Sequence, residues 1–315
     1  MKVLRVINSL GIGGAERSIV SNVPLHIQNG FDMDVVLLNG SDSFFKQEII
    51  QQGVKIISLG NNIYNPFLIF KIIKIIKQYD IIHGHLFPTL YWIALAKLVS
   101  FSNKKFIYTE HATENRRRKK WYWKFMDRLI YRQYDYIISI SDETDKNLQK
   151  HLNFYYNKQT IYNGVDLKKV REEAEVELPE LKNKLKDKKV IIQVAGFRIE
   201  KDQDTLIRAL KELPSNCVIL FVGDGPRLQE CKELAIKLGV VDRIFFSGLQ
   251  SQIGAYIQLA DIAVMSSHWE GFGRAAIECM ALGKPLIASN VAGLSKVVGG
   301  FGLLFEKGNE KELVS

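Results

Sequence analysis

Short apolar runs alternate along the chain with segments in which apolar residues recur every three or four positions. A short run predicts a buried strand, and the helical period predicts an amphipathic helix. In the first half, strands are predicted at residues 2–8, 35–39, 54–59, 80–84, 105–109 and 136–141. One predicted helix follows the first strand and ends near Asn29, and three more are predicted at residues 66–78, 88–99 and 142–151. This alternation predicts a parallel sheet with helices on both faces.

The same pattern restarts in the second half, with predicted strands at residues 190–195, 217–222, 244–247, 262–265 and 286–289. Between the halves, residues 167–188 are highly charged and poorly periodic. We therefore predict an α/β protein made of two Rossmann-like, doubly wound domains. The first domain is expected at residues 1–165, a linker at residues 166–188 and the second domain at residues 189–315.

The formal net charge of +9 comes entirely from the first half. Residues 1–165 contain 22 Lys and Arg against 13 Asp and Glu, whereas residues 166–315 contain 21 of each kind. This asymmetry indicates an anionic partner for the first half, such as an acidic lipid surface, a phosphate-bearing acceptor or a nucleic acid.

The composition places the chain among globular proteins, because 315 residues with 47% hydrophobic side chains suffice for two cores. Cys217, Cys231 and Cys279 have no C-x-x-C spacing, and we interpret them as buried thiols of a reducing compartment. The first seven residues predict a strand rather than a signal peptide. We therefore expect a cytoplasmic protein, and the basic first half adds the expectation of peripheral contact with the inner face of the membrane.

Two glutamates eight residues apart, Glu270 and Glu278, flank the predicted start of a buried helix. Gly271 and Gly273 let the backbone approach a ligand, and a helix start at residues 272–276 suits a pyrophosphate. Carboxylates accept hydrogen bonds from hydroxyl groups, and eight helical residues span roughly 12 Å. That span matches the separation of ribose and sugar in a nucleotide-diphospho-sugar. The same residues also fit a buried helix with one glutamate at each end.

The segment at residues 266–285 resembles the E-x7-E signature of the family 4 glycosyltransferases. GGAER at residues 13–17, NGVD at residues 163–166 and GDGP at residues 223–226 resemble further motifs of that family, in the family's order. The resemblance implies the GT-B architecture, in which two Rossmann-like domains face a cleft. It also implies retention of anomeric configuration, a nucleotide-diphospho-sugar donor, and no bound metal or other cofactor.

The resemblance assigns roles to individual residues. Glu278 would hold the donor ribose, and Glu270 the hydroxyls of the sugar. Lys201 would neutralise the donor diphosphate together with Arg198, although Arg198 stands later in its loop than the family's arginine. His111 and the loop with Gly13 and Gly14 would complete the sugar site from the first domain. The other residues implied in donor binding are Phe272, Gly273, Arg274, Ala275 and Leu249.

Three histidines, His83, His85 and His111, lie near the ends of predicted strands. We interpret His83 and His85 as pointing to opposite faces of their strand, and therefore expect no metal site. If the enzyme inverted configuration, it would need a general base in the first half, and His111 or Glu110 would be the candidates.

A basic run interleaved with aromatic residues begins a predicted helix at residues 116–124. Cations and interfacial aromatic rings together are typical of contact with an anionic membrane. The residues expected to contact membrane or acceptor are Arg116, Arg117, Arg118, Lys119, Lys120, Trp121 and Trp123. Nucleic-acid binding and a solvated helix face are rival interpretations. The resemblance favours the membrane, because many family members use lipid-linked acceptors, and we expect no nucleic acid as a partner.

We expect a glycosyltransferase that moves a hexose-type sugar to a glycan or lipid-linked acceptor in cell-surface polysaccharide, lipopolysaccharide or glycolipid synthesis. Two alternatives stay open. A sugar-nucleotide epimerase of the same architecture would turn over without an acceptor. A non-catalytic basic protein would bind membrane or nucleic acid in a salt-sensitive way, and this binding would survive Glu270→Ala and Glu278→Ala.

Overall fold

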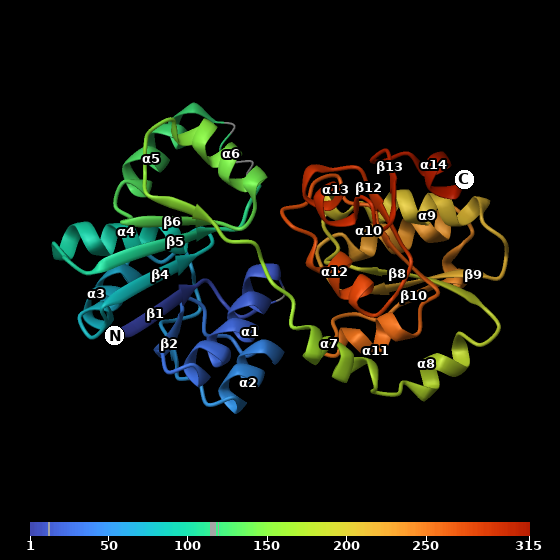
Figure 1. The fold of residues 1–315 in the computed structure, drawn as a ribbon, viewed down its shortest axis with the longest axis horizontal. Helices are drawn as coiled ribbons and strands as arrows, with labels where there is room; N and C mark the ends of the chain where they lie inside the picture. Colours follow the sequence, from blue (N-terminus) through green and yellow to red (C-terminus); the bar gives the residue numbers. More distant parts are fainter. Residues whose placement is uncertain (12, 114–117, 119) are drawn as a thin grey trace. The chain divides into compact units, whose positions relative to one another are not determined.

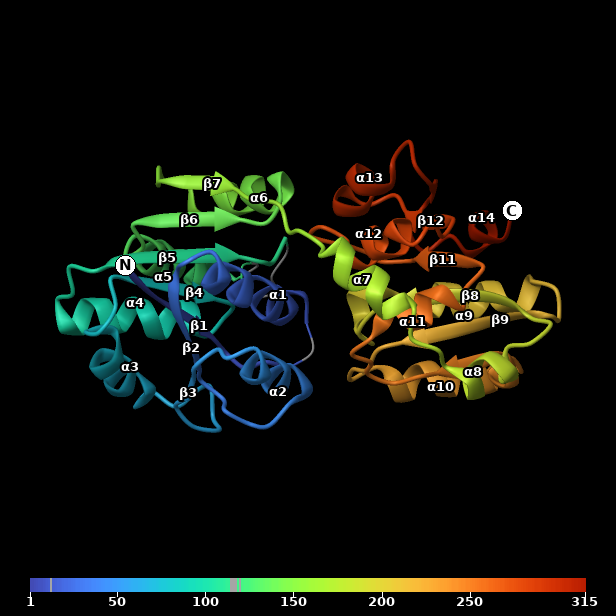
Figure 2. The ribbon, with the colours of Figure 1, turned by 60° about the horizontal axis from the view of Figure 1, so that its bottom comes forward.

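The computed structural model describes residues 1–11, 13–113, 118 and 120–315. These residues form two compact units, unit 1 at Met1–Asn163 and unit 2 at Gly164–Ser315. Figure 1 and Figure 2 show the ribbon of each unit in two orientations. Both units contain a parallel sheet, so the prediction of two Rossmann-like domains is confirmed.

Unit 1 is built on a seven-stranded sheet with the order β3-β2-β1-β4-β5-β6-β7. Its strands are β1 (Lys2–Ile7), β2 (Asp32–Leu37), β3 (Ile56–Ser58), β4 (Ile81–His85), β5 (Lys105–Glu110), β6 (Tyr136–Ser139) and β7 (Lys158–Thr160). The strand order reverses between β1 and β4, because the chain first builds outward from β1 to β3 and then returns. The loops after β1 and β4 therefore diverge, and ligand sites in such sheets form at this point.

Helices cover both faces of the unit 1 sheet (Figure 2). On one face, α1 (Gly14–Gln28) and α2 (Phe44–Gln51) share a core with Val3 and Ile7. The other face belongs to a core around Leu4 and Val6, into which α3 (Leu68–Ile76), α4 (Thr89–Ser100), α5 (Trp121–Tyr131) and α6 (Asp142–Leu152) pack. The division follows from the strand period of two, which sends alternate residues of β1 to opposite faces.

Unit 2 has a six-stranded sheet with the order β10-β9-β8-β11-β12-β13. Its strands are β8 (Lys189–Val194), β9 (Cys217–Val222), β10 (Ile244–Phe246), β11 (Ile262–Met265), β12 (Leu286–Ser289) and β13 (Leu303–Phe305). Its helices are α7 (Leu167–Ala174), α8 (Pro179–Lys184), α9 (Gln203–Glu212), α10 (Leu228–Lys237), α11 (Ile253–Gln258), α12 (Arg274–Ala281), α13 (Ala292–Val298) and α14 (Glu310–Val314), with the 3-10 turns η2 (Ile199–Lys201) and η3 (Val241–Arg243). The strand order reverses between β8 and β11, whose following loops carry Lys201 and Glu270.

The segment expected as a linker contains α7 and α8. Helix α7 packs closely on α11, because a Cβ on Gly254 would lie 2.4 Å from the carbonyl oxygen of Val170. The backbone N–H of Gly254 also donates to Oε2 of the buried Glu173, at 3.1 Å. Although this segment is charged and weakly periodic, Val170 and Glu173 both contact Gly254, and the segment lies within unit 2.

Within the described residues, no helix combines the length and the apolar composition that a membrane span requires. Cys231 and Cys279 are buried and Cys217 is partly buried, all as free thiols.

Candidate active site

Lys201 and Glu270 form an ion pair at the point where the strand order of unit 2 reverses. Lys201 ends η2, which follows β8, and Glu270 lies in the loop after β11. Nζ of Lys201 donates to Oε2 of Glu270, and both side chains are partly exposed. Neighbouring parallel strands end at the same edge of a sheet, so residues 69 positions apart in sequence meet here.

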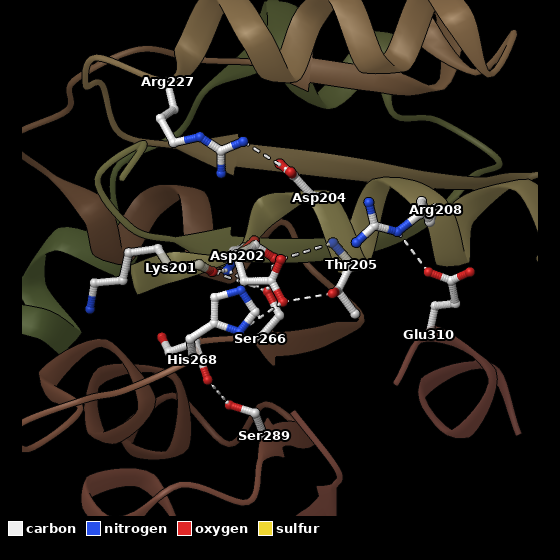
Figure 3. A network of polar contacts seen from close by, with 12 residues as sticks. Lys201, Asp202, Asp204, Thr205, Arg208, Arg227, Ser266, His268, Ser289 and Glu310 are labelled. Atoms are coloured by element: carbon white, nitrogen blue, oxygen red, sulfur yellow. Dashed lines mark hydrogen bonds and ion pairs between the residues drawn. The ribbon is translucent and has the colours of Figure 1, made fainter. Parts of the chain in front are cut away.

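Ser266 and Gln193 hold the loop that carries Lys201. Oγ of Ser266 donates to the backbone carbonyl of Asp202 at 2.7 Å. Nε2 of Gln193 lies 3.0 Å from Oγ of Ser266 and donates to the carbonyl of Lys201 at 3.1 Å. Both side chains are buried, and Figure 3 shows the Lys201 side chain extending away from these contacts.

Asp202 turns the chain from η2 into α9. Its backbone is left-handed, with φ of 45°, a conformation that Asp tolerates better than most residues. Its carboxylate accepts the backbone N–H of Thr205 at 3.3 Å and the Thr205 hydroxyl at 2.6 Å, which caps α9. Nδ1 of His268 lies 3.5 Å from the same carboxylate (Figure 3). The carboxylate of Asp202 therefore stabilises the turn between η2 and α9, and Lys201 just before it pairs with Glu270.

Helix α12 begins at Arg274, directly after Gly273, whose left-handed φ of 83° suits glycine. The intrahelical bonds begin when the N–H of Ala276 reaches the carbonyl of Gly273, at 3.0 Å. Glu278 is one turn further, with 2% of its surface exposed, and its Oε1 lies 3.7 Å from Nη2 of Arg274. The helix thus presents its positive dipole end beside the Lys201–Glu270 pair, with a buried carboxylate behind it.

Gly293 on α13 fixes the position of Glu270. A Cβ at Gly293 would lie 2.2 Å from the carbonyl oxygen of Glu270, so only glycine lets α13 approach the loop this closely. Gly223 acts similarly in the GDGP turn, where a Cβ would lie 2.1 Å from the carbonyl oxygen of Ala195. These glycines shape the two loops around the site.

In unit 1, a column of side chains links β1, β4 and β5. Nη1 of Arg5 lies 2.8 Å from Nδ1 of His83 and 3.2 Å from Nε2 of His85. Nδ1 of His85 lies 3.0 Å from Nε2 of His111, and Nε2 of His83 lies 2.7 Å from Oγ1 of Thr109. The rings of His83 and His85 stack, with centroids 4.4 Å apart.

Our expectation that His83 and His85 point to opposite faces is wrong. Residues two apart on a strand share a face, and both histidines of β4 lie on the same face as Arg5 of the neighbouring β1. Within the described part of the chain, no group of three or more His, Cys, Asp or Glu side chains has the arrangement of a metal site.

Residues 12–169 match the family model described as Glycosyltransferase Family 4, and residues 177–315 match Glycosyl transferases group 1. The chain belongs to the group 1 glycosyltransferases of family 4. The family membership predicted from the E-x7-E resemblance is confirmed.

Relatives of this glycosyltransferase differ in what they act on. It is 28% identical over 155 residues to the N-acetyl-alpha-D-glucosaminyl L-malate synthase of Bacillus anthracis, a match covering 48% of this chain and 41% of that enzyme. The chain thus spans less than half of that relative. It is 24% identical over 327 residues to the N-acetylgalactosamine-N,N'-diacetylbacillosaminyl-diphospho-undecaprenol 4-alpha-N-acetylgalactosaminyltransferase of Campylobacter jejuni, covering 98% of this chain and 86% of that one.

The crystal structure of Anabaena Alr3699/HepE in complex with UDP and glucose has the same fold. Its TM-score is 0.86 at 22% identity, and the match covers 100% of this chain and 88% of that one. At this identity the likeness shows the fold of the glycosyltransferase and leaves its substrates open.

The other expected donor residues are placed as follows. Gly13 caps α1 in an extended conformation and Gly14 begins the helix, where a Cβ would find open space within 4 Å. Arg198 is exposed immediately before η2, and Leu249 is exposed after β10. Phe272 and Ala275 flank the start of α12 and are partly buried. Their roles in binding a donor stay predictions.

The basic run divides into parts with different surroundings. Arg116, Arg117 and Lys119 lie outside the described residues. Arg118 corrects the expectation of a surface contact, because its buried guanidinium pairs with Oε2 of the buried Glu110. Burial alone would lower the pKa of Arg118, but Glu110 and Tyr131 outweigh it and raise that pKa.

The contacts of Glu110 also argue against a role for it as a general base. Its Oε2 also accepts the hydroxyl of Tyr131 at 2.5 Å, and its Oε1 accepts the backbone N–H of Ala112 at 3.0 Å. Both oxygens are therefore engaged, and the carboxylate stabilises the end of β5.

The aromatic residues of the run also separate. Trp121 is 83% exposed at the start of α5, and Lys120 before it is exposed. Trp123 instead packs on the unit 1 core, edge-on to Phe87 and Tyr91 at centroid distances of 6.0 and 5.8 Å. Only the first of the two tryptophans is available on the surface.

Sequence reasoning missed Arg5, Gln193 and Gly293. Arg5 gives a weak signal, because a cation between Val3 and Ile7 occupies the inward-facing position of a buried strand. Gln193 is likewise polar within the apolar β8. Gly293 gives no local signal, because its reason is a backbone that arrives from elsewhere in the sequence.

Gly293→Ala should destabilise unit 2 and displace Glu270. The added Cβ overlaps the carbonyl of Glu270, and relieving such an overlap costs about 1–3 kcal/mol. Denaturant unfolding measures the loss. Gly164→Ala is the control, because a Cβ at Gly164 meets nothing within 4 Å. Equal stability of both variants would contradict the close approach.

Acid should weaken unit 1 before the carboxylates titrate. Burial lowers the pKa of His111 to about 4 and, helped by Arg5, holds the pKa values of His83 and His85 well below their ordinary value. Unfolded histidine titrates near 6.5, so the unfolded state binds more protons below that pH. This stability is fully present above about pH 6.5 and is lost as the pH falls toward about 4.

The loss can be followed by tryptophan fluorescence, because Trp92, Trp121 and Trp123 lie in unit 1 and Trp269 lies in unit 2. For His111 alone it should reach at most about 3 kcal/mol. His111→Asn should flatten the pH dependence, whereas His268→Asn in unit 2 should not. A wild-type stability that stays level between pH 7 and pH 5 would contradict the buried neutral histidines.

Proposed function

We propose that this glycosyltransferase moves a hexose-type sugar from a nucleotide-diphospho-sugar to a glycan or lipid-linked acceptor, with retention of configuration. The observation that carries the proposal is the Lys201–Glu270 pair beside the start of α12. A cation, a helix N-terminus and a carboxylate together offer complementary groups to a diphosphate and to hydroxyls.

The pair would exchange partners when a donor binds. A diphosphate carries more negative charge than one carboxylate, so Lys201 would turn from Glu270 to the phosphates. Glu270 would then accept hydrogen bonds from sugar hydroxyls. As the anomeric bond breaks, negative charge grows on the leaving diphosphate, where Lys201 and the helix N-terminus would stabilise it. We propose that no enzyme nucleophile takes part, and that the leaving phosphate itself would accept the proton of the attacking acceptor hydroxyl.

Glu278 would bind the ribose of the donor. Its carboxylate is buried one turn inside α12, and Arg274 lies beside it. The Anabaena protein is described in complex with UDP and glucose, which supports a nucleotide-sugar donor here. We also propose that His111, Gly13 and Gly14 bind the same donor.

The remaining donor contacts follow from position. Phe272, Gly273 and Ala275 would place their backbone against the diphosphate at the helix start. Arg198 is exposed next to η2, so it would reach the donor as a second cation. Leu249 is exposed after β10 and would contact the base.

Thermal stabilisation by UDP-, GDP- and ADP-sugars tests this function. A ligand that binds only the native state raises the melting temperature once its concentration exceeds its Kd. One donor series should stabilise the wild type, and Glu278→Gln should lose at least about tenfold in affinity for it. Glu233→Gln on the exposed part of α10 should behave as the wild type.

Two results would contradict the proposal. The first is the absence of stabilisation by every donor in a chain that is folded by circular dichroism. The second concerns the chemistry, because an NMR spectrum of the product that shows an inverted anomer would exclude retention.

We further propose that the outer face of α5 contacts an anionic membrane. Trp121, Tyr122, Phe125, Met126 and Leu129 on this helix are exposed. Lys120 and Lys124 beside them are exposed cations. Aromatic rings at the headgroup level and cations for lipid phosphates are the features of an interfacial helix. The Campylobacter relative, whose name includes a diphospho-undecaprenol, supports a lipid-linked acceptor.

Sedimentation with phosphatidylserine-containing and neutral vesicles measures this contact. We expect binding to anionic vesicles that weakens with salt, and a loss of at least about tenfold in Trp121→Ser/Phe125→Ser. Tyr155→Ser is a matched control, because Tyr155 is 92% exposed elsewhere in unit 1. Unchanged binding of the double variant to anionic vesicles would contradict the proposed contact between α5 and the membrane.

A further inference from the structure

The Arg5 column consists of Arg5, His83, His85, Thr109 and His111. No described carboxylate pairs with its cation, Arg5. Arg5 lies on β1, and its partners His83 and His85 lie on the adjacent β4. Burial lowers the pKa of Arg5 to about 10, which still leaves the guanidinium charged at neutral pH. Its hydrogen-bond partners therefore have to be lone pairs.

A guanidinium has only donors, and this decides which histidine nitrogens are unprotonated. Nδ1 of His83 and Nε2 of His85 both face Nη1 of Arg5, so both nitrogens accept. The proton of His83 is then on Nε2, which donates to Oγ1 of Thr109 at 2.7 Å. The Thr109 hydroxyl can accept this bond, so His83 is fully accounted for as a neutral ring.

The contacts of His85 likewise determine which nitrogen of His111 carries the proton. Because Nε2 of His85 accepts from Arg5, its proton is on Nδ1. Nδ1 of His85 lies 3.0 Å from Nε2 of His111 and donates to it. Nε2 of His111 is thus an acceptor, and the proton of its neutral ring is on Nδ1.

We propose that Arg5 is a positioning residue that acts through His85 to fix the proton of His111 on Nδ1. The strands β1, β4 and β5 are consecutive neighbours in the sheet (Figure 2), so the column is held by the sheet itself. The other titratable groups that act on it are His26 of α1 and Glu110 of β5. Burial and the charge of Arg5 favour neutral rings throughout.

The fixed proton determines what His111 can do. His111 is partly exposed, and no described residue accepts a hydrogen bond from its Nδ1. This nitrogen presents an N–H to the surroundings, so His111 is a hydrogen-bond donor and not a general base. Resting on the proposed function, its target is an oxygen of the donor, either a sugar hydroxyl or a phosphate.

The protonation pattern can be read directly from the ¹⁵N spectrum of histidine-labelled wild type at pH 7.5. The chain has 6 histidines, and His111→Asn assigns the key signals. We expect a protonated Nδ1 and an unprotonated Nε2 for His111 and His85, and the reverse for His83. A His111 ring with its proton on Nε2, or doubly protonated, would overturn the proposal.

Variants of Arg5 test the cause. Arg5→Met removes the donor and the charge, so His85 and His111 should populate both neutral forms, and His111 should take up its second proton at a higher pH. Arg5→Lys should retain the wild-type pattern, because an ammonium group also only donates. A His111 spectrum and titration unchanged in Arg5→Met would remove Arg5 from the role even if the wild-type pattern is as expected.

A separate titration tests the contact with the donor. His111→Asn keeps an N–H close to the position of Nδ1, whereas His111→Leu does not. With the nucleotide-sugar that stabilises the wild type, His111→Leu should bind about threefold to tenfold more weakly than His111→Asn. Equal affinity would remove the donor contact but leave the assignment of the proton intact. A wild type that binds no donor would instead contradict the proposed function.

Discussion

The hydrogen bonds that Ser266 and Gln193 make to the carbonyls of Lys201 and Asp202 constrain the site in unit 2. Gln193 lies on β8 and Ser266 directly follows β11, and both bond to the backbone at the end of η2. Both polar side chains are buried, so loss of one partner would leave a group unsatisfied. These bonds hold the backbone of the loop from which the Lys201 side chain extends, so the proposed exchange of Lys201 from Glu270 to a diphosphate would need only that side chain to move.

The reversal of strand order in unit 1 is arranged differently. There the buried cation is Arg5, and its partners are neutral imidazoles instead of a carboxylate. The proposed row of neutral imidazoles ends in an N–H donor at His111, and its positive charge stays on Arg5. Unit 2, by contrast, concentrates charge at Lys201, Glu270 and Glu278, as a diphosphate and hydroxyl groups require. The two edges, similar in topology, thus differ in the charge of the side chains that they carry.

The sequence predicted the sheets well because parallel strands buried on both faces are almost continuous apolar runs, as in β8 and β9. Glu270 and Glu278 stand out in the sequence because of their local spacing, and their roles in binding a donor stay predictions. Prediction from the sequence failed for α7, whose contacts involve Gly254 far along the chain. It also failed for Arg118, because the basic run predicted a contact with membrane or acceptor, whereas Arg118 pairs with the buried Glu110. These structures depend on contacts between distant segments, which local sequence patterns do not reveal.

The most direct test of the account is a calorimetric titration with a nucleoside diphosphate and the matching monophosphate, using the base of the stabilising donor. The diphosphate should bind the wild type at least about tenfold more tightly than the monophosphate, and Lys201→Met should remove most of that difference. Glu270→Gln should retain it, because the glutamate is assigned to the sugar. If Lys201→Met bound both nucleotides as the wild type does, the ion pair would be structural and the phosphate site would lie elsewhere.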